Sequence, residues 1–317
     1  MRRELGQLSL ADGLVEGGAG RNRQLERIAG LVDWAAFERL LGDIYAAPVG
    51  RPSYGPLILF RCLLLAQWYG LSDLALEEAL SDRLSFRRFV GLALADPVPD
   101  HSTFSRFRTE LVERRLSERL LAELNRQLDA RGLMVKAGTL IDASLVAADA
   151  RRPRKDEPLE GRSDRDASWN AMPEQPLFGY KMHLAVDQGS GLVRRAILTP
   201  AHVSDKAPFL ALVQGDERTV YADRGYDGWW YRRELAERGV EDGIMAGSYR
   251  QRPLDADGHA RNRALGRIRA PVERTFAILK RHYGYTRVRY RRLVRNALQL
   301  QLLALAMNLR RALVLVR

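Results

Sequence analysis

The hydrophobic pattern of the chain changes its period at Arg131-Gly132, and this change limits what the chain can fold into. Before it, apolar residues recur every three or four positions, the spacing of amphipathic helices. After it, short apolar runs rich in β-branched residues alternate with helical stretches, which indicates an α/β arrangement. A chain of 317 residues is long enough for two such domains. We predict an all-helical N-terminal domain over residues 1–130 and an α/β domain over residues 131–317 that ends in a C-terminal helix.

The N-terminal part is predicted to contain short helices joined by turns. A glycine break at 17–20 precedes a helix at 31–41, and a turn-rich stretch at 49–56 precedes helices at 56–69, 71–80 and 83–90. A long helix follows the turn at 96–103 and runs to 130. Asp100 and Ser102 are candidate N-caps of that long helix. Arg106 and Arg108 fall in its first turns, so the region suits either a helix-turn-helix that binds DNA or a helical bundle with solvated arginines. The two interpretations are about equally supported.

The α/β part has a defined order of elements. Strands are predicted at residues 139–146, 179–187, 192–198, 219–223 and 240–245, and helices at about 205–213, 229–238 and 269–281, the first of which Ser204 or Asp205 could cap. A polar loop covers 149–176, and a basic loop with Arg250, Arg252, Arg261 and Arg263 precedes the last helix. This is the order of an RNase H-like fold, a mixed sheet flanked by helices. In that fold the first and fourth strands are neighbours, and the late helix packs across them.

The charge balance points to a polyanionic partner. Lys and Arg number 51 against 39 Asp and Glu, a net charge of +12 spread along the chain, which favours nucleic acid. Cys62 is the single cysteine and the five histidines form no His-x-x-x-His pair, so a metal would be held by carboxylates, which select Mg²⁺ or Mn²⁺. The N-terminal residues lack the apolar core of a signal peptide, and polar residues interrupt the apolar stretches 57–69 and 297–309. We expect a cytoplasmic protein.

Three acidic residues stand at isolated positions of the predicted fold. Asp142 interrupts the first strand, Asp223 ends the fourth, and Glu273 lies on the last helix in line with Arg269 and Lys280. Each has an ordinary explanation, because a strand-end aspartate can face solvent and the helix strip can be a ladder of surface ion pairs. The predicted topology, however, brings the three acids within reach of one another. There they would hold two divalent ions for an in-line phosphoryl displacement.

Six segments in combination resemble the DDE transposases of bacterial insertion sequences, in the InsH-like group (insertion sequence five). They are Gly-Arg-Pro-Ser-Tyr at 50–54, Pro-Asp-His-Ser-Thr-Phe-Ser-Arg-Phe-Arg at 99–108, Leu-Ile-Asp-Ala-Ser at 140–144, Phe-Gly-Tyr-Lys-Met-His at 178–183, Tyr-Ala-Asp-Arg-Gly-Tyr-Asp at 221–227 and the strip of Arg269, Glu273 and Lys280. By this resemblance Asp142, Asp223 and Glu273 match the catalytic triad that binds two Mg²⁺ or Mn²⁺ ions. Arg269 and Lys280 match the basic residues that flank the glutamate.

The resemblance also implies a reaction and its partners. It implies an enzyme that binds the terminal inverted repeats of its element, cleaves DNA at the element ends and joins the 3′-hydroxyls to target DNA. The partners would be double-stranded DNA and further copies of the chain on that DNA, with no membrane, in a bacterial, nucleoid-associated protein. Residues 1–130 would form a DNA-binding domain of the InsH N-terminal type. The expected DNA contacts are Arg106, Arg108, Lys181, Arg269 and Lys280.

Some positions depart from this pattern or leave alternatives open. Gly266 stands where the family usually has tyrosine, His202 stands where it tends to have asparagine, and Pro271 predicts either a kink or a helix start. His183 is expected to be packed and hydrogen-bonded. Tyr226, Trp229 and Trp230 follow Asp223 closely and could stack on bases, although at least one tryptophan is expected to pack in the core. Two other functions fit the chain: an inactive, transposase-derived repressor that only binds DNA, and a nuclease on the same fold.

Overall fold

The structure is a computed structural model that describes residues 3, 5–7, 21–46, 52–150, 153, 163–170, 174, 176–248 and 253–316. It divides into two compact units, Met1–Arg131 with Gln301–Arg317, and Gly132–Leu300. The glycine break at 17–20, the start of the 49–56 turn, most of the polar loop 149–176, and Arg250 and Arg252 lie outside the described residues. Residues 301–317, which the sequence assigned to the second domain, group with the first unit. The functional roles of the two domains stay predictions.

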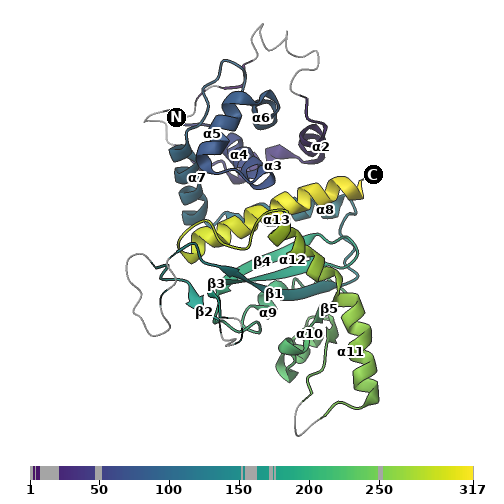
Figure 1. The fold of residues 1–317 in the computed structure, drawn as a ribbon. Helices are drawn as coiled ribbons and strands as arrows, with labels where there is room; N and C mark the ends of the chain where they lie inside the picture. Colours follow the sequence, from purple (N-terminus) through teal and green to yellow (C-terminus); the bar gives the residue numbers. More distant parts are fainter. Residues whose placement is uncertain are drawn as a thin grey trace. The chain divides into compact units, whose positions relative to one another are not determined.

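The first unit is helical throughout its described part (Figure 1). Its helices are α2 (Arg23–Leu31), α3 (Trp34–Leu40), α4 (Pro56–Tyr69), α5 (Asp73–Asp82), α6 (Leu84–Val90), α7 (His101–Glu113), α8 (Ser117–Ala130) and the C-terminal part of α13 (Leu293–Leu315). The helix predicted over 31–41 is α3, which begins three residues later because Asp33 caps it by accepting a hydrogen bond from the Ala35 N–H. Helix α2 was not predicted. The long helix predicted to run to Ala130 is two helices, α7 and α8. It breaks at Arg115, whose φ of 52° is left-handed.

Helix α13 belongs to the first unit from Gln301 onward because its side chains and backbone bond to α4 and α8. The Trp68 indole donates to the Ala306 carbonyl at 2.9 Å, and the Asn308 amide donates to Asn125 Oδ1 at 2.9 Å. In the described residues, α13 is the one helix long and apolar enough to cross a membrane, or one of two candidates if the bent pair α4 and α5 counts as one span. Its apolar window is 78% buried within the protein, as in a core helix.

The second unit is built on a mixed sheet of β1 (Thr139–Ala147), β2 (Ser168–Trp169), β3 (Phe178–Asp187), β4 (Val193–Pro200), β5 (Thr219–Ala222) and β6 (Glu241–Ile244). β1 pairs antiparallel with β3, and β3 with both β4 and β2, while β1, β5 and β6 run parallel. The main order is therefore β4–β3–β1–β5–β6. The predicted RNase H-like order, with the first and fourth predicted strands adjacent, is confirmed.

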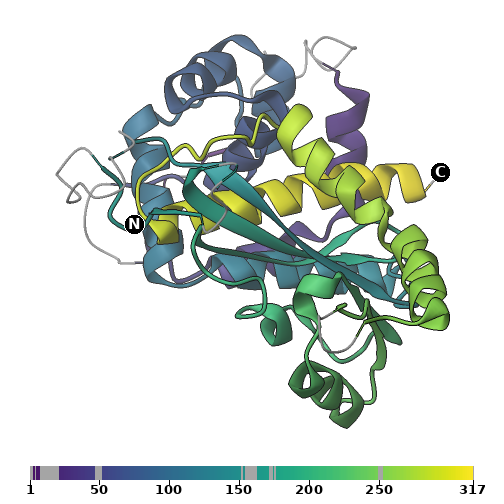
Figure 2. The ribbon, with the colours of Figure 1, turned by 60° about the horizontal axis from the view of Figure 1, so that its bottom comes forward.

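Helices cover both faces of this sheet (Figure 2). The core on one face joins Ile141 and Ala185 to α9 (Phe209–Leu212) and α10 (Trp229–Glu237). Strand residues alternate between faces, so Asp142 and Ser144 point to the other face, where α12 (Pro271–Arg281) contacts β1. Helix α9 is shorter than the helix predicted at about 205–213. It begins after Pro208 rather than at a Ser204 or Asp205 cap.

The sequence missed α11 (Ala256–Arg269), which forms where a basic loop was predicted around Arg261 and Arg263. Asp255 caps it by accepting from the Gly258 N–H at 2.7 Å. None of its residues is buried, so it carries no amphipathic pattern by which a sequence would reveal it. Ala270 separates it from α12, and Pro271 is the first residue of α12. Pro271 thus marks a helix start.

Candidate active site

Parallel pairing of β1 with β5 brings Asp142 and Asp223 to one place. The register pairs Thr139 with Val220 and Leu140 with Tyr221. Two residues beyond the second pair stand Asp142 on β1 and Asp223 just after β5, and both point to the face that α12 covers. The register of this parallel pair therefore brings the two carboxylates to one place on the sheet.

The Asp142 carboxyl is held in a largely buried, basic environment. Its Oδ1 accepts from the Ala143 N–H at 2.8 Å, and its Oδ2 lies 3.4 Å from a guanidinium nitrogen of Arg269. Burial, with a smaller effect of the negative charges of Asp223 and Asp205, raises the pKa of Asp142 to about 6 against the lowering effect of that N–H and of Arg269. A second cation beside this pair would relieve the repulsion between the carboxylates.

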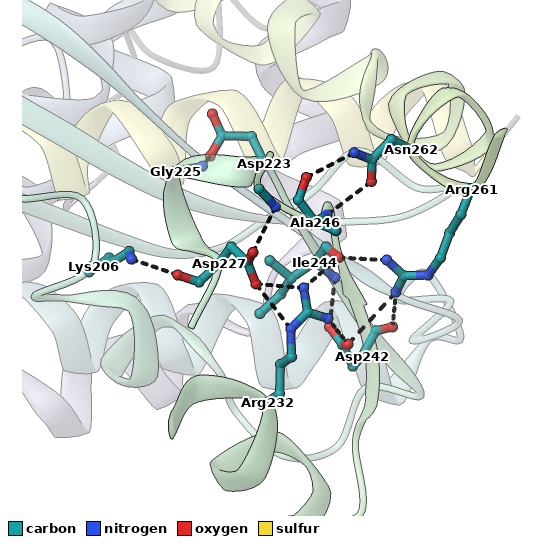
Figure 3. Close-up of polar contacts among 11 residues, drawn as sticks. Lys206, Asp223, Gly225, Asp227, Arg232, Asp242, Ile244, Ala246, Arg261 and Asn262 are labelled. Carbon is teal, nitrogen blue, oxygen red and sulfur yellow. Dashed lines mark hydrogen bonds and ion pairs between the residues drawn. The ribbon is translucent and has the colours of Figure 1, made fainter. Parts of the chain in front are cut away.

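Asp223 belongs to the turn that follows β5. Its Oδ1 accepts from the Gly225 N–H at 2.8 Å and caps a short 3₁₀ turn, η1 (Arg224–Tyr226) (Figure 3). Asp223 Oδ2 has no hydrogen bond to any other described residue, so one oxygen remains available to a ligand.

The structure does not place Glu273 with the two aspartates. Glu273 is exposed in the first turn of α12, and the described residues include no group of three His, Cys, Asp or Glu side chains arranged to hold a metal ion. The helix itself is in position, because Lys280 Nζ donates to Ser144 Oγ at 2.7 Å, two residues beyond Asp142 on the same strand face. Glu273 lies two turns back on the face of α12 that carries Lys280. Two of the three predicted ligands are assembled, and their carboxylate chemistry suits a hard divalent ion.

The basic residues flanking Glu273 point toward β1. The Arg269 side chain is 13% exposed and approaches Asp142, and its Nε is buried without a hydrogen-bond partner among the described residues. Burial lowers the pKa of Lys280. Both side chains contact the strand that carries Asp142, and their predicted contacts with DNA stay predictions.

The other predicted DNA contacts differ in how available they are. The Arg106 side chain is 68% exposed, with Asp100 3.9 Å away. Arg108 is buried and bonds through both terminal nitrogens to the carboxylate of Asp73 on α5. Lys181 Nζ bonds to the Val203 carbonyl at 2.9 Å and to Asp205 at 2.7 Å. Arg108 and Lys181 would have to leave these partners to reach a phosphate.

Two residues near the acid pair have surroundings that the sequence did not predict. Asp205, considered only as a helix cap, carries a charge that raises the pKa values of both Asp142 and Tyr226. Tyr226 is 1% exposed, and its hydroxyl has no partner among the described residues. The sequence marked Tyr226 as an aromatic residue that could stack on bases, whereas the structure buries it. Nothing in the sequence marked Asp205 as part of the site.

Asp227 connects the Asp223 turn to β6 and the segment after it (Figure 3). Its Oδ1 accepts from Arg232 Nη2 at 2.8 Å, its Oδ2 from the Gly247 N–H at 2.7 Å, and its carbonyl from Lys206 Nζ at 2.6 Å. Arg232 also bonds to Asp242 on β6, which lies 3.7 Å from Arg261 of α11. This network fixes the turn against the elements that lead to α12.

The two histidines noted in the sequence have structural contacts. His183 is fully buried, and its Nε2 lies 2.9 Å from Thr199 Oγ1 on β4, as a packed and hydrogen-bonded histidine should. The His202 N–H and Nδ1 both contact Ser168 Oγ of β2. His202 therefore anchors the short edge strand to the turn after β4.

Known proteins match both parts of the chain. Residues 17–110 match a transposase domain of the DUF772 family, and residues 134–309 match the transposase DDE domain family. Among solved structures, the chain is similar to the piggyBac transposase synaptic complex with hairpin DNA, with a TM-score of 0.42 and 11% identity over 92% of this chain and 72% of that one. The DDE domain match alone spans more than half of the chain and contains Asp142, Asp223 and Glu273. The chain therefore belongs to the DDE transposases of the insertion-sequence type.

Proposed function

We propose that this transposase binds the terminal inverted repeats of an insertion sequence, cleaves DNA at the element ends and joins the 3′-hydroxyls to target DNA. The observation that carries the proposal is the pair formed by Asp142 within β1 and Asp223 just after the parallel neighbour β5, on the sheet face that α12, the helix bearing Glu273, contacts. A carboxylate pair on a basic chain suits phosphoryl transfer on a polyanion. Membership of the InsH-like group stays a prediction.

Asp142, Asp223 and Glu273 would hold two Mg²⁺ or Mn²⁺ ions. Bound ions would activate the attacking oxygen and stabilise the leaving oxygen of an in-line displacement. The chain's own residues prepare this site: the Ala143 N–H orients the Asp142 carboxylate, and the Gly225 N–H orients that of Asp223. Glu273 would complete the set when its exposed side chain turns toward the two aspartates, on a helix already anchored at Ser144.

DNA is proposed to bind through the basic residues on both units. Arg106 is the most exposed of the predicted contacts, and Arg269 and Lys280 lie beside the acid pair. Arg108 and Lys181 contribute only if DNA displaces Asp73 and Asp205 from them. Several copies would act together on the two element ends.

A strand-transfer assay tests this function. The full chain is incubated with Mg²⁺, a target plasmid and duplexes copied from the DNA that flanks the reading frame, with their ends either intact or pre-cleaved. The proposed reaction gives joined products from both substrates. Joined products from neither substrate, with cleavage of the intact ends, would instead identify a nuclease on the same fold.

An inactive repressor derived from a transposase is the second candidate. The exposed position of Glu273, apart from Asp142 and Asp223, is the observation that favours it. A repressor would bind the flanking duplexes without nicking them at any Mg²⁺ or Mn²⁺ concentration. Metal-dependent nicking in the same assay excludes it.

A further inference from the structure

Two consecutive tryptophans stand exposed at the start of α10. Trp229 is 74% exposed and Trp230 is 45% exposed, whereas Trp68 in the first unit is 6% exposed. Indole rings are large and apolar, so two exposed neighbours lose more by facing water than most surface residues. Such a pair indicates a surface that binds a partner.

The pair follows the acid site closely along the chain and is reached through a fixed turn. Trp229 follows Asp223 by six residues, so their Cα atoms lie at most about 20 Å apart even in a fully extended chain. Tyr226, between them, packs its buried ring on Phe209 at 5.3 Å. Asp227 is bonded through its carboxylate and its carbonyl. The turn that connects the catalytic candidate to the tryptophans is therefore braced at two consecutive residues.

The shape and charge of this surface fit a nucleobase. The two indole rings are 5.9 Å apart at 84°, an edge-to-face arrangement in which they do not stack flat on each other. The Arg233 guanidinium lies 5.8 Å from the centre of the Trp230 ring, and Arg224 is exposed on the turn before the pair. A flat aromatic face with neighbouring cations is the arrangement that binds a base together with its phosphate.

We propose that Trp229, supported by Trp230, stacks on an unpaired nucleobase of the DNA strand that lies at the acid site. The base must be unpaired because bases inside a duplex are covered on both faces by their neighbours. This inference rests on the proposed function, since it assumes that DNA reaches Asp142 and Asp223. It adds that the DNA there is opened locally and that the start of α10 holds the exposed base.

Binding of the full chain to two matched duplexes tests the inference. One duplex carries a single unpaired 2-aminopurine and the other carries the same base paired with thymine, and dissociation constants are measured at one fixed salt concentration. The wild-type protein is expected to prefer the unpaired base and to quench its fluorescence. Trp229→Ala lowers that preference about fivefold or more, whereas Trp229→Phe, which can still stack, keeps most of it. Leu74→Ala, which removes another exposed apolar side chain in the first unit, is the control.

The outcomes separate this inference from the proposed function. An equal preference in the wild-type and Trp229→Ala proteins would overturn the inference. A change in solution mass of Trp229→Ala without a change in preference would also overturn it and would assign the surface to a second copy of the chain. If the wild-type protein binds the paired duplex but shows no preference, only this inference fails. If it binds neither duplex, the proposed function fails with it.

Discussion

At the scale of single residues, His183 shows how burial decides the role of a titratable group. Its ring is fully buried in the sheet and contacts Thr199. Burial, with a smaller effect of the charge of Lys181, lowers the pKa of His183 to about 4 against the opposing charge of Asp205. His183 is therefore neutral near pH 7 and stabilises the sheet by packing rather than by charge.

The lowered pKa of His183 predicts that the free energy of unfolding depends on pH through this residue. An unfolded histidine has a pKa of about 6.5, so the unfolded chain takes up a proton more readily than the folded one. The contribution of neutral His183 to the free energy of unfolding is complete above about pH 6.5. It is lost as the pH falls toward about 4, which lowers the free energy of unfolding by at most about 3 kcal/mol. Urea unfolding of the wild-type and His183→Gln proteins across this range should show a smaller loss in the variant. An equal loss of unfolding free energy in the two proteins as the pH falls would contradict this prediction.

Substitution by alanine is expected to have opposite effects on stability at two glycines. A Cβ on Gly179 of β3 would lie 2.2 Å from the Val146 carbonyl oxygen of β1, so Gly179→Ala should destabilise the second unit by about 1–3 kcal/mol or more. A Cβ on Gly266 in the middle of α11 would meet nothing within 4 Å, so Gly266→Ala should stabilise by about 0.5–1 kcal/mol. The urea midpoints of unfolding of the two variants, each compared with that of the wild-type protein, measure these effects. Destabilisation by Gly266→Ala would show that α11 makes a close contact there.

At the scale of elements, local capping decided several boundaries. Asp100, chosen from the sequence as a candidate N-cap of α7, accepts from the Thr103 N–H at 2.6 Å and from the Ser102 hydroxyl at 2.8 Å. Ser102, the other candidate, only donates to Asp100. The predicted helix start is therefore correct, and the structure identifies the cap.

The two candidates should differ when each is changed to alanine. Asp100→Ala should cost about 1 kcal/mol of stability because the Thr103 N–H loses its acceptor, whereas Asp100→Asn should keep most of it. Ser102→Ala should cost less than Asp100→Ala, since the cap remains. Thermal unfolding of the three variants measures this order. Equal losses for the two alanine variants would be incompatible with Asp100 as the cap.

Sequence patterns predicted most of the elements whose residues face a core, although α2, which buries Leu25, Ile28 and Leu31, was missed. Alternation of apolar residues was enough for β1, β3, β4 and β5, and Pro56 marked the start of α4. Helix α11 was missed because it buries no residue, and the break between α7 and α8 was missed because the apolar spacing continues across Arg115. Contacts distant in sequence, such as Trp68 with Ala306, left no local pattern.

At the scale of the whole molecule, the candidate site depends on strand pairing that no single segment encodes. Asp142 and Asp223 were predicted together only because the order of elements matched a known topology, and the register of β1 with β5 supports that placement. The effect of Asp205 on Asp142 was beyond prediction, because a turn brings it there. The position of Glu273 depends on a side-chain conformation and on bound ions, which a sequence does not specify.

The central claim is that Asp142, Asp223 and Glu273 act together in metal-dependent cleavage. The most direct test is Mg²⁺-dependent nicking of a plasmid that carries the DNA flanking the reading frame, by the wild-type protein and by Asp142→Asn, Asp223→Asn and Glu273→Gln. Each variant should nick at least about 100-fold more slowly while still binding the DNA. Glu237→Gln, an exposed acid of α10, should nick at the wild-type rate. Nicking by Asp142→Asn or Glu273→Gln at the wild-type rate would contradict the account.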